Sequence, residues 1–300
     1  MGGIVTAGFL KYKLFALIFL AFMAYGCAVA GNIELALPPR KSDALTGSAI
    51  FQHLKTMSLK DREEWLFREF RLGNIPGRLR TLVPVTFRSD RGDGKESELV
   101  VFVTSDYLSF GSDDDNFHMP MTPMLAQRLA DEMECLLPTP MLVDRIWTAS
   151  NLKLKPRPIP PSPAMTTVPV FWDHEIFLRE LWEGSISPEV VSDGAPLLVA
   201  GHKKDVVIIN NPEKMEKKVF IYGWHETDGK PIQPVYGGHV IWYADYSHGI
   251  RLVSRHCRID GVSADLGEVL RDESLFRLVS QSDRPFIDTA YPTVPGLYPE

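Results

Sequence analysis

The sequence predicts an α+β protein, with N-terminal helices and short antiparallel strands followed by a mostly antiparallel β second half with flanking helices. Some segments carry apolar residues at helical spacing after a Ser or Thr that can cap a helix. Others alternate between apolar and polar residues and are separated by Asp, Gly and Ser turns. Of the 300 residues, 45% are hydrophobic and 23% are charged, which is typical of a globular chain and excludes a disordered one.

The first thirty residues are typical of a secretory signal peptide. Two lysines precede an unbroken apolar run, Leu14–Met23, which is shorter than the roughly 18 residues that a membrane-spanning helix needs. Small residues at 28–30 then suit cleavage by a signal peptidase. We therefore expect residues 1–30 to be removed and the chain to be exported, to the periplasm or outside the cell. The alternative is a lipoprotein anchored through a lipid on Cys27.

Residues 31–154 form the predicted N-terminal α+β half. Ser42 and Ser58 can cap two helices, and two Thr-Pro pairs further along each place a hydroxyl cap before a proline at the first helical position. The helices predicted from these four caps run over 42–57, 58–68, 123–137 and 140–150. In the segments between these helices apolar residues recur at every second position, which predicts strands at 83–88, 98–104 and 107–110.

A proline-rich strap, 155–165, is predicted to join this half to a β-rich C-terminal half, 166–300. Its many prolines favour an extended chain and cannot enter a helix or a central strand. In the second half the same patterns predict a helix at 173–183, strands at 206–210, 218–225, 239–246 and 250–255, and helices at 264–271 and 275–280. A turn at 227–230 is expected to join the second and third of these strands in a hairpin.

The charge balance excludes one class of partner. Lys and Arg number 32 against 38 Asp and Glu, so the net charge of -6 has the wrong sign for binding nucleic-acid phosphates. No segment after the N-terminus is apolar for long enough to predict an internal membrane helix. We therefore expect no nucleic-acid partner, and membrane contact only through a lipid on Cys27.

Two cysteines, Cys135 and Cys257, remain after processing. In an oxidising compartment such a pair can persist as a disulfide. Cys135 is placed near the end of an apolar helix, where the helix dipole raises the pKa of a thiol, which argues against a catalytic thiolate. The prediction is a structural disulfide between the two cysteines across the strap.

Histidines are concentrated in one part of the chain. Five of the eight lie between 202 and 256: His202, His225, His239, His248 and His256. They coincide with three polar clusters at the ends of predicted strands, 201–205, 222–226 and 243–249. Strand ends and turns are where sites usually lie. The hypothesis is that folding brings the clusters around His202, His225 and His248 into one polar cleft.

The candidate site residues come from these clusters. His202 and His248 are assigned acid and base roles, and Asp205 or Asp245 would orient an imidazole. The substrate-binding residues, including a cation for developing negative charge and a hydroxyl for nucleophilic attack, are Lys203, His225, Tyr246, Ser247 and Arg251. No metal ligand is assigned, because no pair has HExxH spacing and no C-x-x-C occurs. No cofactor is identified.

One of these clusters has a short family resemblance. Ser247-His248-Gly249-Ile250-Arg251-Leu252 resembles the Ser-His-Gly-Cys-hydrophobic-Arg motif of L,D-transpeptidases, exported enzymes that crosslink peptidoglycan through a thiolate. The cysteine of that motif is absent here, and Ile250 follows Gly249. The resemblance covers six residues, and no catalytic role is carried over from it.

These observations together predict an exported, hydrolase-like enzyme of the bacterial cell envelope that uses His/Asp acid–base chemistry. Its substrate would be a cell-envelope polymer or a small molecule, a choice that rests on location alone. The alternative is a non-catalytic envelope binding or assembly protein whose polar clusters are structural. Convergence of the imidazoles around one cleft would favour the enzyme, because acid–base groups must reach one substrate.

Overall fold

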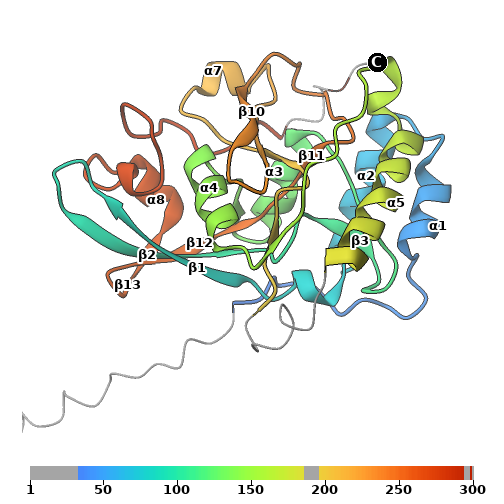
Figure 1. The fold of residues 1–300 in the computed structure, drawn as a ribbon, viewed down its shortest axis with the longest axis horizontal. Coiled ribbons are helices and arrows are strands. Elements are labelled where there is room, and N and C mark those ends of the chain that lie inside the picture. Colours follow the sequence, from blue (N-terminus) through green and yellow to red (C-terminus); the bar gives the residue numbers. More distant parts are fainter. Residues whose placement is uncertain (1–32, 186–195, 294–297, 299–300) are drawn as a thin grey trace, which may run out of the picture. The chain divides into compact units, whose positions relative to one another are not determined.

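The computed structural model describes residues 33–185, 196–293 and 298. The predicted signal peptide, residues 1–30, lies outside the described residues. The α+β class is confirmed, because helices and mostly antiparallel sheets are mixed along the chain (Figure 1). Within the described residues no helix is long and apolar enough to cross a membrane.

The first two helices begin where hydroxyl residues precede them. Helix α1 (Gly47–Leu54) is shorter than the predicted helix 42–57, and the predicted cap at Ser42 is wrong: the helix follows Thr46, whose side chain forms no capping hydrogen bond. Helix α2 (Leu59–Arg71) is capped by Ser58, whose Oγ accepts a hydrogen bond from the N–H of Asp61 at 3.1 Å. A short 3-10 helix, η1 (Gly77–Leu79), then leads into the first sheet.

The larger sheet has five strands and contains residues from both predicted halves. Its order is β1-β2-β12-β13, with β5 also paired to β12. The pairs are antiparallel, and β2 joins β12 with Val103 opposite Val253. The strands are β1 (Val83–Asp90), β2 (Glu96–Val103), β5 (Cys135–Leu136), β12 (Val253–Ile259) and β13 (Val262–Asp265).

Helix α3 (Pro123–Glu132) ends earlier than the predicted helix 123–137. Glu134 adopts a left-handed conformation, with φ at 50°, which an α-helix cannot continue. The chain then joins the larger sheet as β5, so Cys135 lies in a strand and the prediction that it lies near a helix end is wrong.

The predicted disulfide between Cys135 and Cys257 is also not formed, because both thiols are free and buried. Strand β5 places Cys135 opposite Ser254, and Cys257 lies three residues further along β12. At about 3.3 Å per residue this offset is roughly 10 Å, beyond the roughly 7 Å between Cα atoms that a disulfide can bridge.

The smaller sheet brings the histidine-rich segments together. It has the order β10-β9-β8-β11, with β8 and β11 parallel and the other pairs antiparallel. The predicted strand 239–246 is wrong: the chain there runs in turns, and only an isolated bridge joins Val240 to Lys218. The segment that directly follows the turn at 227–230 pairs with the preceding strand instead. Its two prolines are tolerated because this strand lies at the edge of the sheet. The strands are β8 (Lys204–Val206), β9 (Ile221–His225), β10 (Pro231–Tyr236) and β11 (His248–Gly249).

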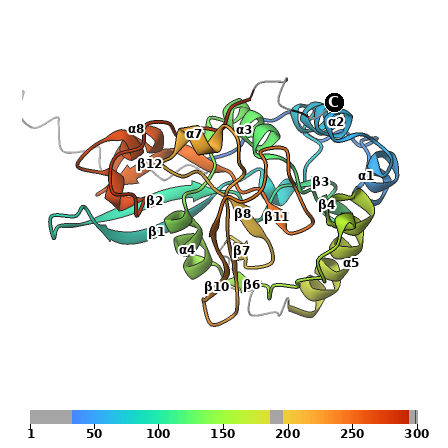
Figure 2. The ribbon, with the colours of Figure 1, turned by 90° about the horizontal axis from the view of Figure 1, so that it is seen from above.

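Two small sheets and the remaining helices complete the described structure. Figures 1 and 2 show α1, α2 and α5 gathered at one end, and α8 beside the β1–β2 hairpin at the other. The remaining elements are β3 (Ser109–Gly111), β4 (Asn116–His118), α4 (Pro140–Ala149), β6 (Leu152–Lys153), η2 (Pro163–Thr166), α5 (Val168–Ser185), β7 (Val199–Ala200), α7 (Pro212–Met215), α8 (Leu266–Arg271) and η3 (Phe276–Leu278).

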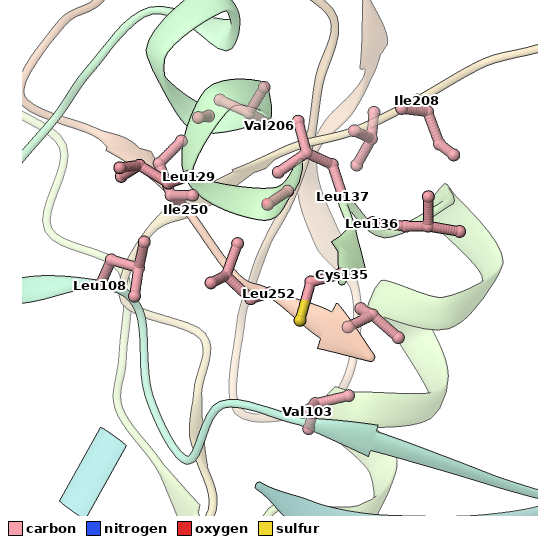
Figure 3. Packing of buried hydrophobic residues seen from close by; sticks show 14 of the residues in the cluster. Val103, Leu108, Leu129, Cys135, Leu136, Leu137, Val206, Ile208, Ile250 and Leu252 are labelled. Atoms are coloured by element: carbon pink, nitrogen blue, oxygen red, sulfur yellow. The ribbon is translucent and has the colours of Figure 1, made fainter. Parts of the chain in front are cut away.

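One large apolar cluster lies between the two sheets and the helices. Figure 3 shows its centre, where side chains from β2, α3, β5 and the segments beside β8 and β11 meet. The sulfur of Cys135 lies among these aliphatic side chains, and burial raises the pKa of that thiol to about 12. This core fixes the loops that follow β2 and precede β8, which carry the candidate site. The residues labelled in the figure are Val103, Leu108, Leu129, Cys135, Leu136, Leu137, Val206, Ile208, Ile250 and Leu252.

Candidate metal centre

Asp106 lies in the loop between β2 and β3, and its side chain is fully buried. Its Oδ1 accepts a hydrogen bond from the N–H of Tyr107 at 2.8 Å, and Nη2 of Arg78 lies 3.7 Å from Oδ2. Burial raises the pKa of this carboxyl group, but the neighbouring imidazoles of His118 and His202 outweigh burial and lower it. Asp106 is therefore a carboxylate.

His118, the last residue of β4, is held between two carboxylates. Its Nε2 lies 3.0 Å from Oδ2 of Asp106, and its Nδ1 lies 3.0 Å from Oε2 of Glu175, which also accepts the backbone N–H of His118. Burial lowers the pKa of His118, but Glu175 and Asp106 outweigh it and raise the pKa to about 9. Without an ion the ring carries a proton on each nitrogen and donates to both carboxylates, and binding an ion through Nε2 would require loss of the proton that faces Asp106.

His202 enters the same space from the turn between β7 and β8. Gly201 makes this turn with φ at 105°, and a Cβ there would lie 2.5 Å from the carbonyl oxygen of Leu154, so only glycine fits. Nε2 of His202 lies 3.4 Å from Oδ1 of Asp106. The side chain is 1% exposed, and within the described residues neither ring nitrogen has a hydrogen-bond partner. Burial lowers the pKa of His202 to about 3, so the imidazole is neutral.

Asp106, His118 and His202 together form what we call the Asp–His–His cluster. Each offers one ligand atom, and the three atoms lie within 4.8 Å of one another. Ligands at about 2.1 Å from a tetrahedral ion are roughly 3.4 Å apart. Nε2 of His118 lies 3.0 Å from Oδ2 of Asp106 and Nε2 of His202 lies 3.4 Å from its Oδ1, so the two imidazoles approach different oxygens of one carboxylate at separations of this size. Glu175 would hold Nδ1 of His118 while Nε2 faces the ion, as the outer carboxylate of many metal sites does. The residues present therefore fit a divalent metal ion.

The cluster opens into a pocket of about 430 Å³ that lies against α5. The wall holds both charges and apolar surface, which is typical of a site for a partly polar small molecule or polymer end. His118, His202 and Glu175 line it, and Asp106 lies behind them, outside the lining. The other lining residues are Arg78, Asp113, Asp114, Asn116, Leu154, Leu178, Arg179, Trp182 and Glu183.

The predicted cleft around His202, His225 and His248 is not formed, so the convergence that would have favoured the predicted enzyme does not occur among these three imidazoles. Register places His248 opposite Lys204 and Lys204 opposite Gly223, so the backbones of the three clusters are neighbours in the smaller sheet. Their side chains have different partners, and only His202 lines the pocket described above. Nε2 of His225 lies 2.9 Å from Asp144 instead.

Lys203 and Tyr246, both predicted to bind substrate, contact each other in the interior. Nζ of Lys203 donates to the carbonyl oxygen of Tyr246 at 2.7 Å and lies 3.3 Å from Nδ1 of His174. The hydroxyl of Tyr246 accepts the N–H of Ile159, in the proline-rich strap, at 2.9 Å. Burial lowers the pKa of Lys203 to about 8. These contacts tie the strap to the smaller sheet.

Asp205 and Arg251 form a second buried pair away from the pocket lining. Oδ2 of Asp205 accepts the hydroxyl of Tyr107 at 2.7 Å, and Nε of Arg251 lies 3.9 Å from Oδ1. Burial raises the pKa of Asp205 to about 6. Arg251 donates to the carbonyl oxygens of Thr104 and Val199, so it links the loop after β2 to β7.

Asp245, Ser247 and His248 form a third group. Oδ1 of Asp245 accepts both the Oγ hydrogen and the backbone N–H of Ser247, at 2.5 and 2.8 Å. Nε2 of His248 lies 4.0 Å from Oδ2 of Asp245, and burial lowers the pKa of His248 to about 4. Ser247 is therefore hydrogen-bonded to a carboxylate and not to an imidazole base, which differs from an activated serine nucleophile.

Sequence reasoning missed Asp106, His118 and Glu175. The three are distant in sequence from His202, so no spacing motif contains them. One signal was present: Asp106 lies two residues after a predicted strand, at 98–104, in a turn of the kind where functional residues often lie. Comparisons of the chain with protein-family models, with curated proteins and with solved structures found no match.

Proposed function

We propose that this protein is a metal-dependent hydrolase in which Asp106, His118 and His202 bind one zinc ion or a similar divalent metal ion. The observation that carries the proposal is the convergence of two imidazoles and a carboxylate beside a pocket that both imidazoles line. Two histidines and one carboxylate are a recurrent catalytic zinc set, which leaves one position for water or substrate. Such an ion lowers the pKa of its bound water and so supplies a hydroxide nucleophile near neutral pH.

The protein's own groups would orient these ligands and hold the substrate. Glu175 fixes the ring of His118, and Gly201 directs His202 toward Asp106. His202 is 99% buried with no other polar partner in the described structure, a state that would cost free energy unless a ligand satisfies it. Trp182 and Leu178 would cover the apolar part of a substrate, and Arg78 and Arg179 would face its polar groups.

The exported location predicted from residues 1–30 is part of this proposal, and so is the envelope substrate class that depends on it. A mixed charged and apolar pocket suits the end of an envelope polymer or a small molecule. Hydrolysis remains the reaction class proposed from the sequence. An ion held by Asp106, His118 and His202 would activate the attacking water, the role that the sequence assigned to His248 as a base.

The experiment measures metal content and hydrolysis in the same preparation. Purified protein dialysed against Zn²⁺ should hold about one ion per chain, since one three-ligand set is present. His202→Ala and Asp106→Asn should lose this ion, and His248→Ala, which removes an equally buried histidine outside the pocket, should keep it. Hydrolysis of p-nitrophenyl ester and phosphoester model substrates should require the ion and return when Zn²⁺ is restored after chelation. Failure to bind any divalent metal would refute the proposal, and binding without hydrolysis would favour the non-catalytic envelope protein.

A further inference from the structure

A second pocket of about 430 Å³ lies away from the Asp–His–His cluster, at the start of α5. None of its lining residues lines the first pocket. Its walls come from the α1–α2 junction, the η2–α5 junction and the turns before β11. The lining residues are Lys55, Thr56, Met57, Leu59, Arg62, Thr166, Thr167, Val168, Val240, Trp242, Tyr243 and Ala244.

Arg62 is the unusual residue of this second pocket. Its side chain is 5% exposed, its Nε is buried without a hydrogen-bond partner, and its guanidinium forms no ion pair among the described residues. A buried cation without a partner is unfavourable, and burial accordingly lowers the pKa of Arg62. The guanidinium carbon lies 5.4 Å from the ring centre of Phe171, in the first turn of α5, which orients the group but does not satisfy its donors.

The carboxylate of Glu63 attracts Arg62 but forms no ion pair with it, because its oxygens accept other hydrogen bonds. Glu63 is fully buried and accepts three hydrogen bonds, two from Thr122 at 2.6 and 2.7 Å and one from the hydroxyl of Tyr298 at 2.6 Å. Glu63 and Tyr298 are the charged or titratable groups that influence Arg62. The lining of the second pocket contains Arg62 and Lys55 but no acidic side chain.

The start of α5 adds a second attraction for negative charge. This helix has 18 residues, its first turn holds no acidic side chain, and Thr166, Thr167 and Val168 line the pocket there. The first N–H groups of a helix lack partners within the helix and carry positive partial charge, so they attract anions. Pro169 has no N–H and the N–H of Phe171 is bonded to Thr167, so Val168 and Val170 supply these groups here. Met57 and Trp242 provide an apolar wall beside these groups, and Trp242 is 38% exposed.

We propose that this second pocket binds a small organic anion, with its carboxylate or phosphate on Arg62 and the start of α5 and its apolar body against Met57 and Trp242. Arg62 would then donate charge-assisted hydrogen bonds that nothing in the described structure now accepts. The site is separate from the proposed metal centre. Glu175, which contacts His118 of that centre, lies seven residues along α5 from Val168, about 10 Å at 1.5 Å per residue.

The test measures binding of two probes, phenyl phosphate and benzoate, by isothermal titration calorimetry, with quenching of tryptophan fluorescence as a second readout. The wild-type chain should bind at least one probe at one site per chain. Arg62→Met should weaken binding by about tenfold or more, the factor expected when a charge-assisted hydrogen bond is lost. Arg145→Met is the matched control: Arg145 also lies over an aromatic ring, Phe87, but outside this pocket, so binding should be unchanged.

Thermal unfolding of the same variants separates ligand binding from a structural role. Arg62→Met should unfold no earlier than the wild type, because it removes a buried cation without a partner. If that variant does not fold, Lys55→Glu tests the same site from an exposed position and should weaken probe binding by repulsion. Probe binding that is unchanged in Arg62→Met or in Lys55→Glu, or no saturable binding to the wild type, would overturn the proposal. None of these outcomes depends on metal content.

Discussion

Replacing Gly249 by alanine should reveal how tightly the segments behind the Asp–His–His cluster are packed. A Cβ at this position would lie 2.6 Å from Cβ of Lys203 and 2.6 Å from Cδ1 of Tyr107. Both neighbours are almost completely buried, and each is fixed by a hydrogen bond of its side chain, to Tyr246 and Asp205 respectively. Neither can move aside without breaking that bond, so the backbone must shift.

The expected loss of stability is therefore at the upper end of the range for overpacking, about 3 kcal/mol. At roughly 2 °C per kcal/mol for a chain of this size, Tm should fall by about 6 °C. Urea denaturation followed by circular dichroism measures the free energy directly. Gly184→Ala is the control, because Gly184 lies in α5 with open space around it and should gain up to about 1 kcal/mol from helix propensity.

A second readout of Gly249→Ala connects packing to the proposed metal centre. Tyr107 follows Asp106 in the chain and Lys203 follows His202, so displacement of the first pair should displace the ligands. Zinc affinity should fall together with stability. If Gly249→Ala were within about 0.5 kcal/mol of the wild type, as surface substitutions usually are, the packing described for Lys203 and Tyr107 would be wrong.

Three further predictions test other parts of the described structure. Thr122→Ala should lower the free energy of unfolding by about 2 kcal/mol, because it removes the α3 cap and one of the two donors to Oε2 of Glu63, the other being Tyr298. Thr122→Ser should retain most of that free energy, and equal losses in the two variants would contradict this account. Burial raises the pKa of Asp265, but hydrogen bonds, first that from Arg255, outweigh it and lower the pKa. Asp265→Ala should therefore lower the free energy of unfolding by about 1 kcal/mol at pH 7, because it removes the cap of α8. The difference in free energy of unfolding between the wild type and Asp265→Ala should be fully present at pH values above the pKa of Asp265 in the unfolded chain. It should disappear as the pH falls through the lower pKa of Asp265 in the folded chain, and a difference independent of pH would refute this prediction. Cys135 and Cys257, whose pKa values burial raises to about 12, should react with a thiol reagent at pH 8 only after unfolding.

Local signals in the sequence predicted the α+β class and most helix starts. Ser58, Thr122 and Thr139 each cap a helix through a side-chain oxygen, because a cap is a contact between residues three apart. Where the local sequence pattern gave a wrong element, tertiary contacts were the cause. The helix starting at Pro123 was expected to reach 137, but pairing of Cys135 and Leu136 with β12 ended it.

The candidate site was predictable only in part. The concentration of histidines reflects a real neighbourhood, since the segments of His202, His225 and His248 adjoin in the smaller sheet. Which way each side chain points depends on the partners packed against it, and those partners come from distant parts of the chain. His118 precedes His202 by 84 residues (202 minus 118), so neither could identify the other from spacing.

The pairing of β2 with β12 also determines when the protein can fold. Val103 and Val253 are opposite each other across a sequence separation of 150 residues (253 minus 103). Closing so long a loop is slow, and until β12 arrives β2 presents an unpaired edge that invites aggregation. A chain that ends before residue 253 would hold every ligand of the Asp–His–His cluster and still lack the strand that completes the larger sheet. Truncations from the C-terminus should therefore fail as an abrupt loss of soluble protein rather than as a gradual loss of activity.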